Sequence, residues 1–387
     1  MKYIENISYK RVAYTKFCSF MPPKTRELLE GKKCFWNLGY RAKVTDVINK
    51  YHNEQICHVD IWKKAYRKLC YKDHQYLIEA EIFFLANIKN IKKSKSKLTN
   101  ISVILILVVK NDLLRVKMLL SYYRRLGIER FVVLDDKSVD GTLEYLLSQD
   151  DVDVYNSDVN YTTLGRQAWI SRLVDLYGFN RWYLIVDSDE LIAYSGMEEK
   201  SIPELTCYLD SVGRNVLRMM LLEMYPRNDI LKMPSLTAEQ ITSTYIYFDC
   251  DGYRIQYTDL LTCVVGGARC REFYNGNYKE APYLTKYPLI KICSGMIPCH
   301  SHMNFPFCYN RNTPLSGCML HYKFLPQDIE KYRQRVREGN FQSSSKEYKK
   351  YLDLISIDGE FIMYDKEISI EYKDSSSLDI FEIEHFE

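Results

Sequence analysis

The stretch ISVILILVV (Ile101–Val109) decides the fold that we expect for this chain. It is an almost unbroken run of aliphatic and β-branched residues, which is typical of a strand buried on both faces of a parallel sheet. The next segment, Leu113–Leu126, has the apolar spacing of an amphipathic helix that ends at Gly127. The sequence therefore predicts a strand followed directly by a helix.

The same alternation continues along the chain. We predict further strands at Arg130–Leu134, Val152–Tyr155 and Trp182–Val186, and helices at Thr142–Leu147 and Leu164–Tyr177. Strands and helices that alternate in short units indicate a doubly wound α/β layer. Beyond this layer we predict short strands at Asn215–Glu223 and Tyr245–Phe248, a helix near Pro326–Glu338 and a terminal strand within Met363–Tyr372.

The flanking regions differ from this layer in composition. Residues 1–95 are basic and have helical spacing of apolar residues, so we expect a helical N-terminal region there. The polar, basic run Lys89–Ser102 is the predicted linker to a catalytic domain at 100–355. Residues 356–387 form an acidic C-terminal tail, and we expect its last part, Lys373–Glu387, to be loose.

The overall composition is that of a soluble globular protein, with 47% hydrophobic and 27% charged residues. The 12 cysteines are scattered without a regular framework, which favours reduced thiols in a cytoplasmic protein. Met1–Lys10 lacks the pattern of a signal peptide, and Ile101–Val109 is about half the length needed to cross a bilayer. We expect a cytoplasmic protein whose basic N-terminal region is available for peripheral contact with the inner face of a membrane.

Polar residues follow the predicted parallel strands at the points where the strands end. These residues are Lys110 and Asn111 after the first strand, Asp135 and Asp136 after the second, and Asp187 after the fourth. Open parallel sheets bind ligands at this edge. The Gly-rich patterns of dinucleotide-binding proteins and P-loop enzymes do not occur, so those two classes are disfavoured.

The segment Asp187-Ser188-Asp189 comes directly after an apolar strand. Two carboxylates on either side of a small residue can bind Mn²⁺ or Mg²⁺, and the ion can then bridge a diphosphate. The same segment in an exposed loop would be an ordinary acidic turn. Its position at the end of a buried strand favours a metal site at Asp187 and Asp189.

Several segments together resemble the bacterial subgroup of family 2 glycosyltransferases. VVLDDKSVDGT (Val132–Thr142) is similar to the second-strand signature of that family, and WYLIVDSDELI (Trp182–Ile192) is similar to its metal strand. The opening VVKNDLLRVKMLLSYYRRLGI (Val108–Ile128) is also similar. Later segments resemble the family in the same order: LLEMYP (Leu221–Pro226), GGARCR (Gly266–Arg271), KYPLIK (Lys286–Lys291), SHMNFP (Ser301–Pro306) and LHYKFL (Leu320–Leu325).

The resemblance implies a GT-A fold, a nucleotide-diphosphate sugar donor, a divalent metal and inversion at the anomeric carbon. Asp135 or Asp136 would then contact the base, and Asp187 and Asp189 the ribose and the metal–diphosphate. His321 would be a third metal ligand, and Lys323 and Arg166 would approach the phosphates. This sequence departs from the family at Lys137, where Gly or Asn is usual, so the shape of that turn is open.

Inversion needs a general base to remove the proton of the acceptor hydroxyl, and Glu223 and Glu190 are the candidates. We favour Glu223, because it follows an apolar strand directly before Met-Tyr-Pro, where a carboxylate could face the acceptor. We therefore predict a glycosyltransferase that acts on a glycan or lipid-linked acceptor in surface polysaccharide biosynthesis, with no nucleic-acid partner. A sugar-nucleotidyltransferase is an alternative, although it typically needs a Gly-rich basic loop after the first strand. A non-catalytic sugar-nucleotide-binding protein is the other.

Overall fold

The computed structural model describes residues 88–386, apart from residues 96, 100–101, 159, 162, 258–261, 293–296, 301, 306–312 and 339–345. The predicted N-terminal helices lie outside these described residues. Within them the chain is a mixed α/β protein with a six-stranded mixed sheet and a four-stranded mixed sheet, besides two-stranded pairs. No helix in this described part is both long and apolar enough to cross a membrane.

The six-stranded sheet has the strand order β1-β4-β3-β2-β5-β12. Its parallel centre consists of β2 (Ile104–Val109), β3 (Arg130–Asp135), β4 (Val152–Ser157) and β5 (Arg181–Val186), which confirms the predicted strands. The edge strands β1 (Ile88–Lys92) and β12 (Leu289–Ile292) run antiparallel to their neighbours. The central strands are buried on both faces, as their continuous apolar runs indicated.

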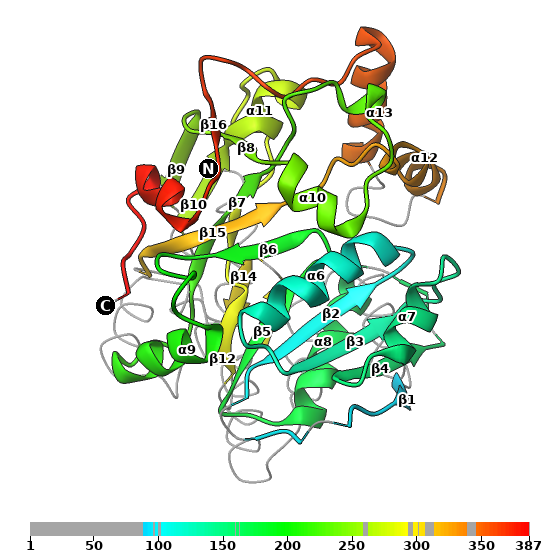
Figure 1. The fold of residues 1–387 in the computed structure, drawn as a ribbon, viewed down its shortest axis with the longest axis vertical. Helices are drawn as coiled ribbons and strands as arrows, with labels where there is room; N and C mark the ends of the chain where they lie inside the picture. The colour runs from blue at the N-terminus through cyan, green and yellow to red at the C-terminus, as the bar shows by residue number, and fades with distance from the viewer. Residues whose placement is uncertain are drawn as a thin grey trace, which may run out of the picture.

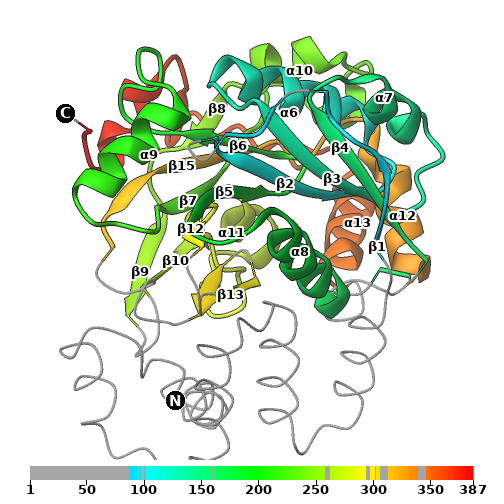
Figure 2. The same cartoon turned by 90° about the horizontal axis from the view of Figure 1, so that it is seen from below.

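Helices cover both faces of this sheet (Figures 1 and 2). On one face lie α6 (Leu113–Arg125) and α7 (Thr142–Ser148), and on the other lies α8 (Thr163–Tyr177). Leu105 and Leu107 of β2 belong to the core on the α6 side, whereas Ile104 and Ile106 belong to the core that contains residues of α8. The alternation follows from the two-residue period of a strand.

Gly127 ends α6, as predicted. Its φ is +84°, and the next amide, that of Ile128, donates to the carbonyl of Tyr123 at 3.0 Å. A Cβ at this position would also lie 3.1 Å from Cδ of Pro203. Both the backbone conformation and the close neighbour therefore require glycine here.

The four-stranded sheet has the order β11-β7-β15-β6 and lies beside the first sheet (Figure 1). Its strands are β6 (Glu190–Ala193), β7 (Arg218–Glu223), β11 (Thr285–Lys286) and β15 (Leu315–His321). His321, the last residue of β15, is the register partner of Glu190 on one side and of Glu223 on the other. Register alone thus brings three titratable residues to one edge.

Strand β15 contains an irregularity near its start. The pairing with β7 runs from Leu315 opposite Arg218 to Cys318 opposite Met220, so β15 has one residue more than its partner over this interval. Gly317 lies within it at φ +153°, and a Cβ there would sit 2.3 Å from the carbonyl oxygen of Ala193. Only glycine fits this bulge without displacing β6.

Two predictions about the flanks are wrong. The first four residues of the predicted linker, Lys89–Lys92, belong to β1, which pairs with β4 at the sheet edge. The acidic tail is not loose, because Leu378, Ile383 and Phe386 are buried and Glu384 forms an ion pair with Arg214 at 2.6 Å. The predicted terminal strand is present in shorter form as β16 (Ser369–Glu371), paired with β8 (Tyr247–Asp249).

The remaining described elements connect and cover the two sheets. They are α9 (Ile202–Ser211), η2 (Ile230–Lys232), α10 (Ala238–Thr244), β9 (Tyr253–Tyr257), β10 (Thr262–Gly266), α11 (Gly267–Tyr274), β13 (Ile297–His300), β14 (Met303–Phe305), α12 (Asp328–Glu338), α13 (Lys346–Asp358) and η5 (Ser375–Phe381).

Candidate metal and diphosphate site

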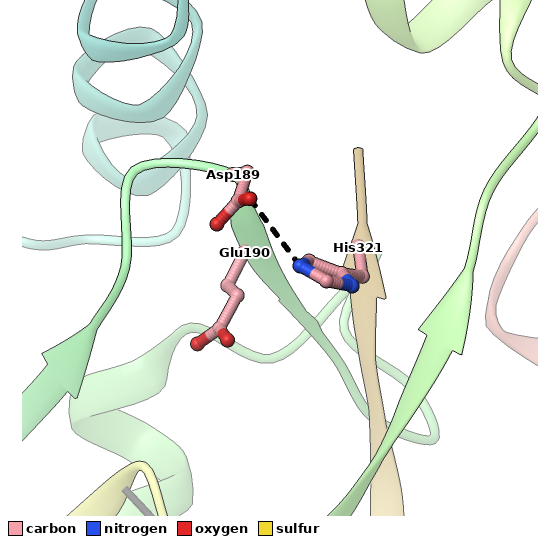
Figure 3. Close-up of side chains that lie close together, drawn as sticks. All are labelled: Asp189, Glu190 and His321. Carbon is pink, nitrogen blue, oxygen red and sulfur yellow. Dashed lines mark ion pairs between the residues drawn. The ribbon is translucent and has the colours of Figure 1, made fainter. Parts of the chain in front are cut away.

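The acidic segment predicted to bind metal lies between β5 and β6, beside the end of β15. Ligand atoms of Asp189, Glu190 and His321 all lie within 4.8 Å of one another. Nε2 of His321 is 3.3 Å from Oδ2 of Asp189, and Figure 3 shows the imidazole and this carboxylate pointing toward each other. The structure therefore brings together two of the three predicted metal ligands.

The second ring nitrogen of His321 faces Glu223. Nδ1 is 2.9 Å from Oε2 of Glu223, and both side chains are buried. Burial alone would lower the pKa of His321, but the carboxylates of Glu223 and Asp189 outweigh burial and raise this pKa to about 9. The pKa of Asp189 is held well below its ordinary value, because His321 and Arg115 together outweigh the effect of burial.

The third predicted ligand, Asp187, is paired with cations. Nη2 of Arg166 donates to Oδ1 of Asp187 at 2.6 Å, and Nζ of Lys286 lies 3.6 Å from Oδ2. Lys286 also forms an ion pair with Oε1 of Glu190 at 2.7 Å. Burial raises the pKa of Glu190 despite this lysine, whereas Arg166 and Lys286 overcome burial and lower the pKa of Asp187.

The predicted base-binding residues lie at the end of β3. Oδ2 of Asp135 accepts a hydrogen bond from the Ser138 amide at 3.0 Å, but its Oδ1 is buried without a hydrogen-bond partner among the described residues. Asp136 is 3% exposed, and its amide donates to the carbonyl of Val109 at 2.8 Å. Leaving a buried acceptor unsatisfied is costly, so Oδ1 of Asp135 is suited to accept from a ligand.

Lys137, where the sequence departs from the family pattern, lies in the turn after β3. The φ of Lys137 is +59°, the left-handed conformation that Gly and Asn adopt most easily. The ammonium group of Lys137 donates to Oδ1 of Asn160 at 2.8 Å. Lys137 thus adopts the left-handed conformation itself and points its charge toward Asn160.

Two residues predicted to contact the donor, Lys110 and Asn111, follow β2. Lys110 is exposed at the strand end. Asn111 has φ +49°, and its side-chain oxygen accepts from the Val139 amide at 2.8 Å. Asn111 therefore joins the turns that follow β2 and β3, which places these two polar segments side by side.

The loop that carries Asp189 is also tied to α6 and α12. The hydroxyl of Ser188 donates to Asp112, which in turn forms an ion pair with Lys331 at 2.9 Å. The guanidinium of Arg115 reaches both Asp112 and Asp328. This ion network fixes the loop that carries Asp189 to α6 and α12.

Sequence reasoning missed four charged residues around the site: Arg115, Arg269, Lys286 and Glu347. Lys286 and Arg269 stand in the segments KYPLIK and GGARCR, where a cation within apolar or Gly-rich surroundings was the available signal. Glu347 of α13 binds Arg269 at 3.0 Å and lies 3.6 Å from Nζ of Lys323. Nothing in the local sequence marks Glu347.

Comparison with known proteins says little about the family or activity of this chain. No protein-family model matches the chain, and no curated protein matches it. Similar solved structures include a glucosyl-3-phosphoglycerate synthase from Mycobacterium tuberculosis in complex with Mn²⁺, uridine diphosphate and phosphoglyceric acid. It has 12% identity and a TM-score of 0.22, over 32% of this chain and 43% of that one.

Two further structures are similar at the same level. A putative glucose-1-phosphate thymidylyltransferase from Bacillus anthracis in complex with a sucrose has 11% identity and a TM-score of 0.23, over 34% of this chain and 60% of that one. HddC from Yersinia pseudotuberculosis has 11% identity and a TM-score of 0.25, over 50% and 77%. This chain thus spans less than two thirds of the first two proteins. Such likeness assigns neither family nor activity, and the function is inferred from the site.

Proposed function

We propose that this chain is a metal-dependent glycosyltransferase of the GT-A type that moves a sugar from a nucleotide-diphosphate donor to a glycan or lipid-linked acceptor, with inversion. One observation carries the proposal. Asp189 and His321, which are far apart in the sequence, place a carboxylate oxygen and an imidazole nitrogen 3.3 Å apart at the edge where the parallel strands end. Open α/β sheets bind their ligands at this edge.

The residues fit a divalent cation. Asp189 and His321 offer one oxygen and one nitrogen ligand, and Asp187 lies beside them with cations of its own. An imidazole nitrogen suits Mn²⁺ better than Mg²⁺, which prefers oxygen ligands and water. When bound, the ion would supply charge stabilisation to the departing diphosphate.

The surrounding side chains fit the rest of the donor. Arg166 and Lys286 bring two buried positive charges to Asp187, where a diphosphate would replace part of their present pairing. Lys323 follows the metal ligand His321 by two residues and is suited to the leaving phosphate. The unsatisfied Oδ1 of Asp135 supports recognition of a base N–H. These are charge-assisted contacts of the kind that hold phosphates tightly.

Of the two predicted general bases we now prefer Glu190 to Glu223, which was the preferred residue from the sequence. Burial raises the pKa of Glu190, which makes it the stronger proton acceptor, whereas the pKa of Glu223 is lowered because Arg269 and His321 outweigh burial. Release of Glu190 from Lys286 on donor binding would free the carboxylate for the acceptor hydroxyl. A place in surface polysaccharide biosynthesis accords with a glycan or lipid-linked acceptor.

The test is nucleotide release from a panel of UDP-, GDP-, dTDP- and CMP-sugars with Mn²⁺. We expect release with one donor, loss of release on chelation, and loss of about a hundredfold or more in Asp189→Ala. The matched control is Asp158→Ala, which removes an exposed carboxylate that pairs with Lys89. It should release nucleotide like the wild type.

Three other outcomes would contradict the proposal. Release that does not depend on metal or on Asp189 would exclude this mechanism. Pyrophosphate formation from a nucleoside triphosphate and a sugar phosphate would instead identify a sugar-nucleotidyltransferase. Tight donor binding without any turnover across a broad acceptor panel would indicate a non-catalytic sugar-nucleotide-binding protein.

A further inference from the structure

The contact between His321 and Glu223 is built into the sheet. The two residues are direct register partners at the ends of the parallel strands β15 and β7. Both are nearly inaccessible, at 5% and 3% exposure, and Nδ1 of His321 lies 2.9 Å from Oε2 of Glu223. Since each residue ends its strand, the pair lies at the edge that faces Asp189.

The other oxygen of Glu223 is also occupied by a protein group. Nε of Arg269, at the start of α11, lies 2.7 Å from Oε1 of Glu223. Arg269 is 4% exposed, and its Nη1 binds Oε1 of Glu347 on α13 at 3.0 Å. A chain of alternating charges therefore runs from the buried His321, Glu223 and Arg269 to the partly exposed Glu347. Each oxygen of the buried Glu223 carboxylate therefore lies beside a protein nitrogen, Oε2 beside His321 and Oε1 beside Arg269.

We propose that Glu223 is a positioning residue that orients His321 for the metal ion. By accepting a hydrogen bond from Nδ1–H, Glu223 would leave Nε2, the ring nitrogen on the side of Asp189, as the one that gives up its proton and binds the ion. Metal-binding histidines commonly donate their second N–H to a carboxylate, which fixes both the tautomer and the ring orientation. The inference rests on the proposed function, because it takes His321 as a metal ligand.

This role differs from that of a general base in what it predicts. A general base acts on the acceptor, so its loss reduces turnover and leaves metal affinity intact. A positioning residue acts through His321, so its loss weakens metal binding even when neither donor nor acceptor is present. Loss of such a carboxylate typically costs 10–100-fold in metal affinity.

The experiment measures Mn²⁺ affinity of the full chain without nucleotide, by the free-Mn²⁺ electron paramagnetic resonance signal and by calorimetry. We expect the dissociation constant to rise about 10–100-fold in Glu223→Ala and about tenfold in the isosteric Glu223→Gln. His321→Ala should lose at least as much. The double variant Glu223→Gln/His321→Ala should bind no more weakly than His321→Ala alone, within about twofold, because Glu223 acts only through this ring.

Several results would overturn the proposal. Wild-type Mn²⁺ affinity in Glu223→Gln together with lost turnover would make Glu223 a general base instead. Additive losses in the double variant would mean that Glu223 does not act through His321. Asp189→Ala separates the two levels of inference: unchanged Mn²⁺ binding there would remove the metal site and the proposed function. Loss of binding in Asp189→Ala with wild-type binding in Glu223→Gln would remove the positioning role alone.

Folding is checked in the same preparations. Glu223→Ala leaves the buried Arg269 without its nearest carboxylate, so this variant is compared by thermal unfolding and far-ultraviolet circular dichroism. Glu223→Gln keeps the shape of the side chain and decides the question if Glu223→Ala does not fold. Asp158→Ala is again the matched control, with expected wild-type affinity for Mn²⁺.

Discussion

Replacing Arg115 by methionine should lower the free energy of unfolding by about 3–5 kcal/mol, the range for breaking a buried ion pair. Arg115 of α6 and Asp328 at the start of α12 are both 3% exposed. Nη1 of Arg115 donates to Oδ1 of Asp328 at 3.0 Å. Nε and Nη2 donate to the carbonyls of Tyr322 and Lys323 at 2.9 and 2.6 Å.

The magnitude follows from what the substitution leaves behind. Methionine fills much of the volume of the arginine stem, so the cost is mainly electrostatic. Asp328 would stay buried without its cation. Two carbonyls would each lose one hydrogen bond, at about 0.5–1.5 kcal/mol for each, although that of Lys323 would keep the Tyr332 hydroxyl at 2.8 Å. The backbone after His321 would also lose its anchor to α6.

The same helix supplies a matched control. Arg124 forms a two-point ion pair with Asp151, with both N–O distances at 2.7 Å, but its side chain is 34% exposed. Arg124→Met should therefore cost less than about 1 kcal/mol. The residue type, the helix and the charged partner are of the same kind, so the two variants differ mainly in burial and in the two backbone carbonyls that only Arg115 binds.

The assay is equilibrium urea unfolding followed by circular dichroism and by tryptophan fluorescence, with the denaturant slope checked for agreement between probes. Adding Asp328→Asn to Arg115→Met should recover part of the loss, because the stranded charge is removed. The reasoning is refuted if Arg115→Met costs no more than Arg124→Met. It is equally refuted if the second substitution makes the loss larger.

Three further predictions concern stability. The pKa of Glu347 is lowered to about 2, because Lys323 and Arg269 outweigh burial. This carboxylate therefore stabilises the fold above its unfolded pKa near 4.5, and the stabilisation is lost as the pH falls toward 2. Glu347→Gln should then cost about 1–2 kcal/mol at neutral pH, reduced for partial exposure, and the gap to wild type should narrow below about pH 4.5 in urea titrations; a gap independent of pH would contradict this. Lys137→Asn should raise the free energy of unfolding by about 0.5–1 kcal/mol by relieving a left-handed lysine, and a lower melting temperature would contradict it. Phe386→Ala should cost about 3 kcal/mol, because the ring is buried, whereas a loose tail would show no change.

The sheet around residues 101–190 was predictable because its signals are local. A strand buried on both faces requires a continuous apolar run, and each helix shows its own period, so Ile104–Val109 and Arg181–Val186 could be found without knowing their neighbours. Asp189 was found for the same reason, as it follows such a strand. Edge strand β1 was missed because its pattern IKNIK is exposed and polar and depends on pairing with β4.

The site residues beyond the acidic segment depend on long-range pairing. His321 and Glu223 were found through a family resemblance, but their contact exists because β15 and β7 pair in one particular register. A carboxylate in sequence looks the same whether it removes a proton or orients a ring. The ion pair between Arg269 and Glu347 could not be predicted from the sequence, because it forms only where α11 and α13 pack together.

The extra residue in β15 determines which face of the sheet each later side chain of the strand points to. Side chains alternate between the two faces, so deleting one residue between Leu315 and Cys318 would turn His321 away from Asp189 and Glu223. Such a chain would still contain each of the ligand residues in the right order. A search for the proposed ligand residues alone would accept such a sequence, although its His321 would face the opposite side of the sheet. The arrangement of this site therefore depends on the number of residues in β15 as well as on their identity. Gly317 is the residue that allows the extra position.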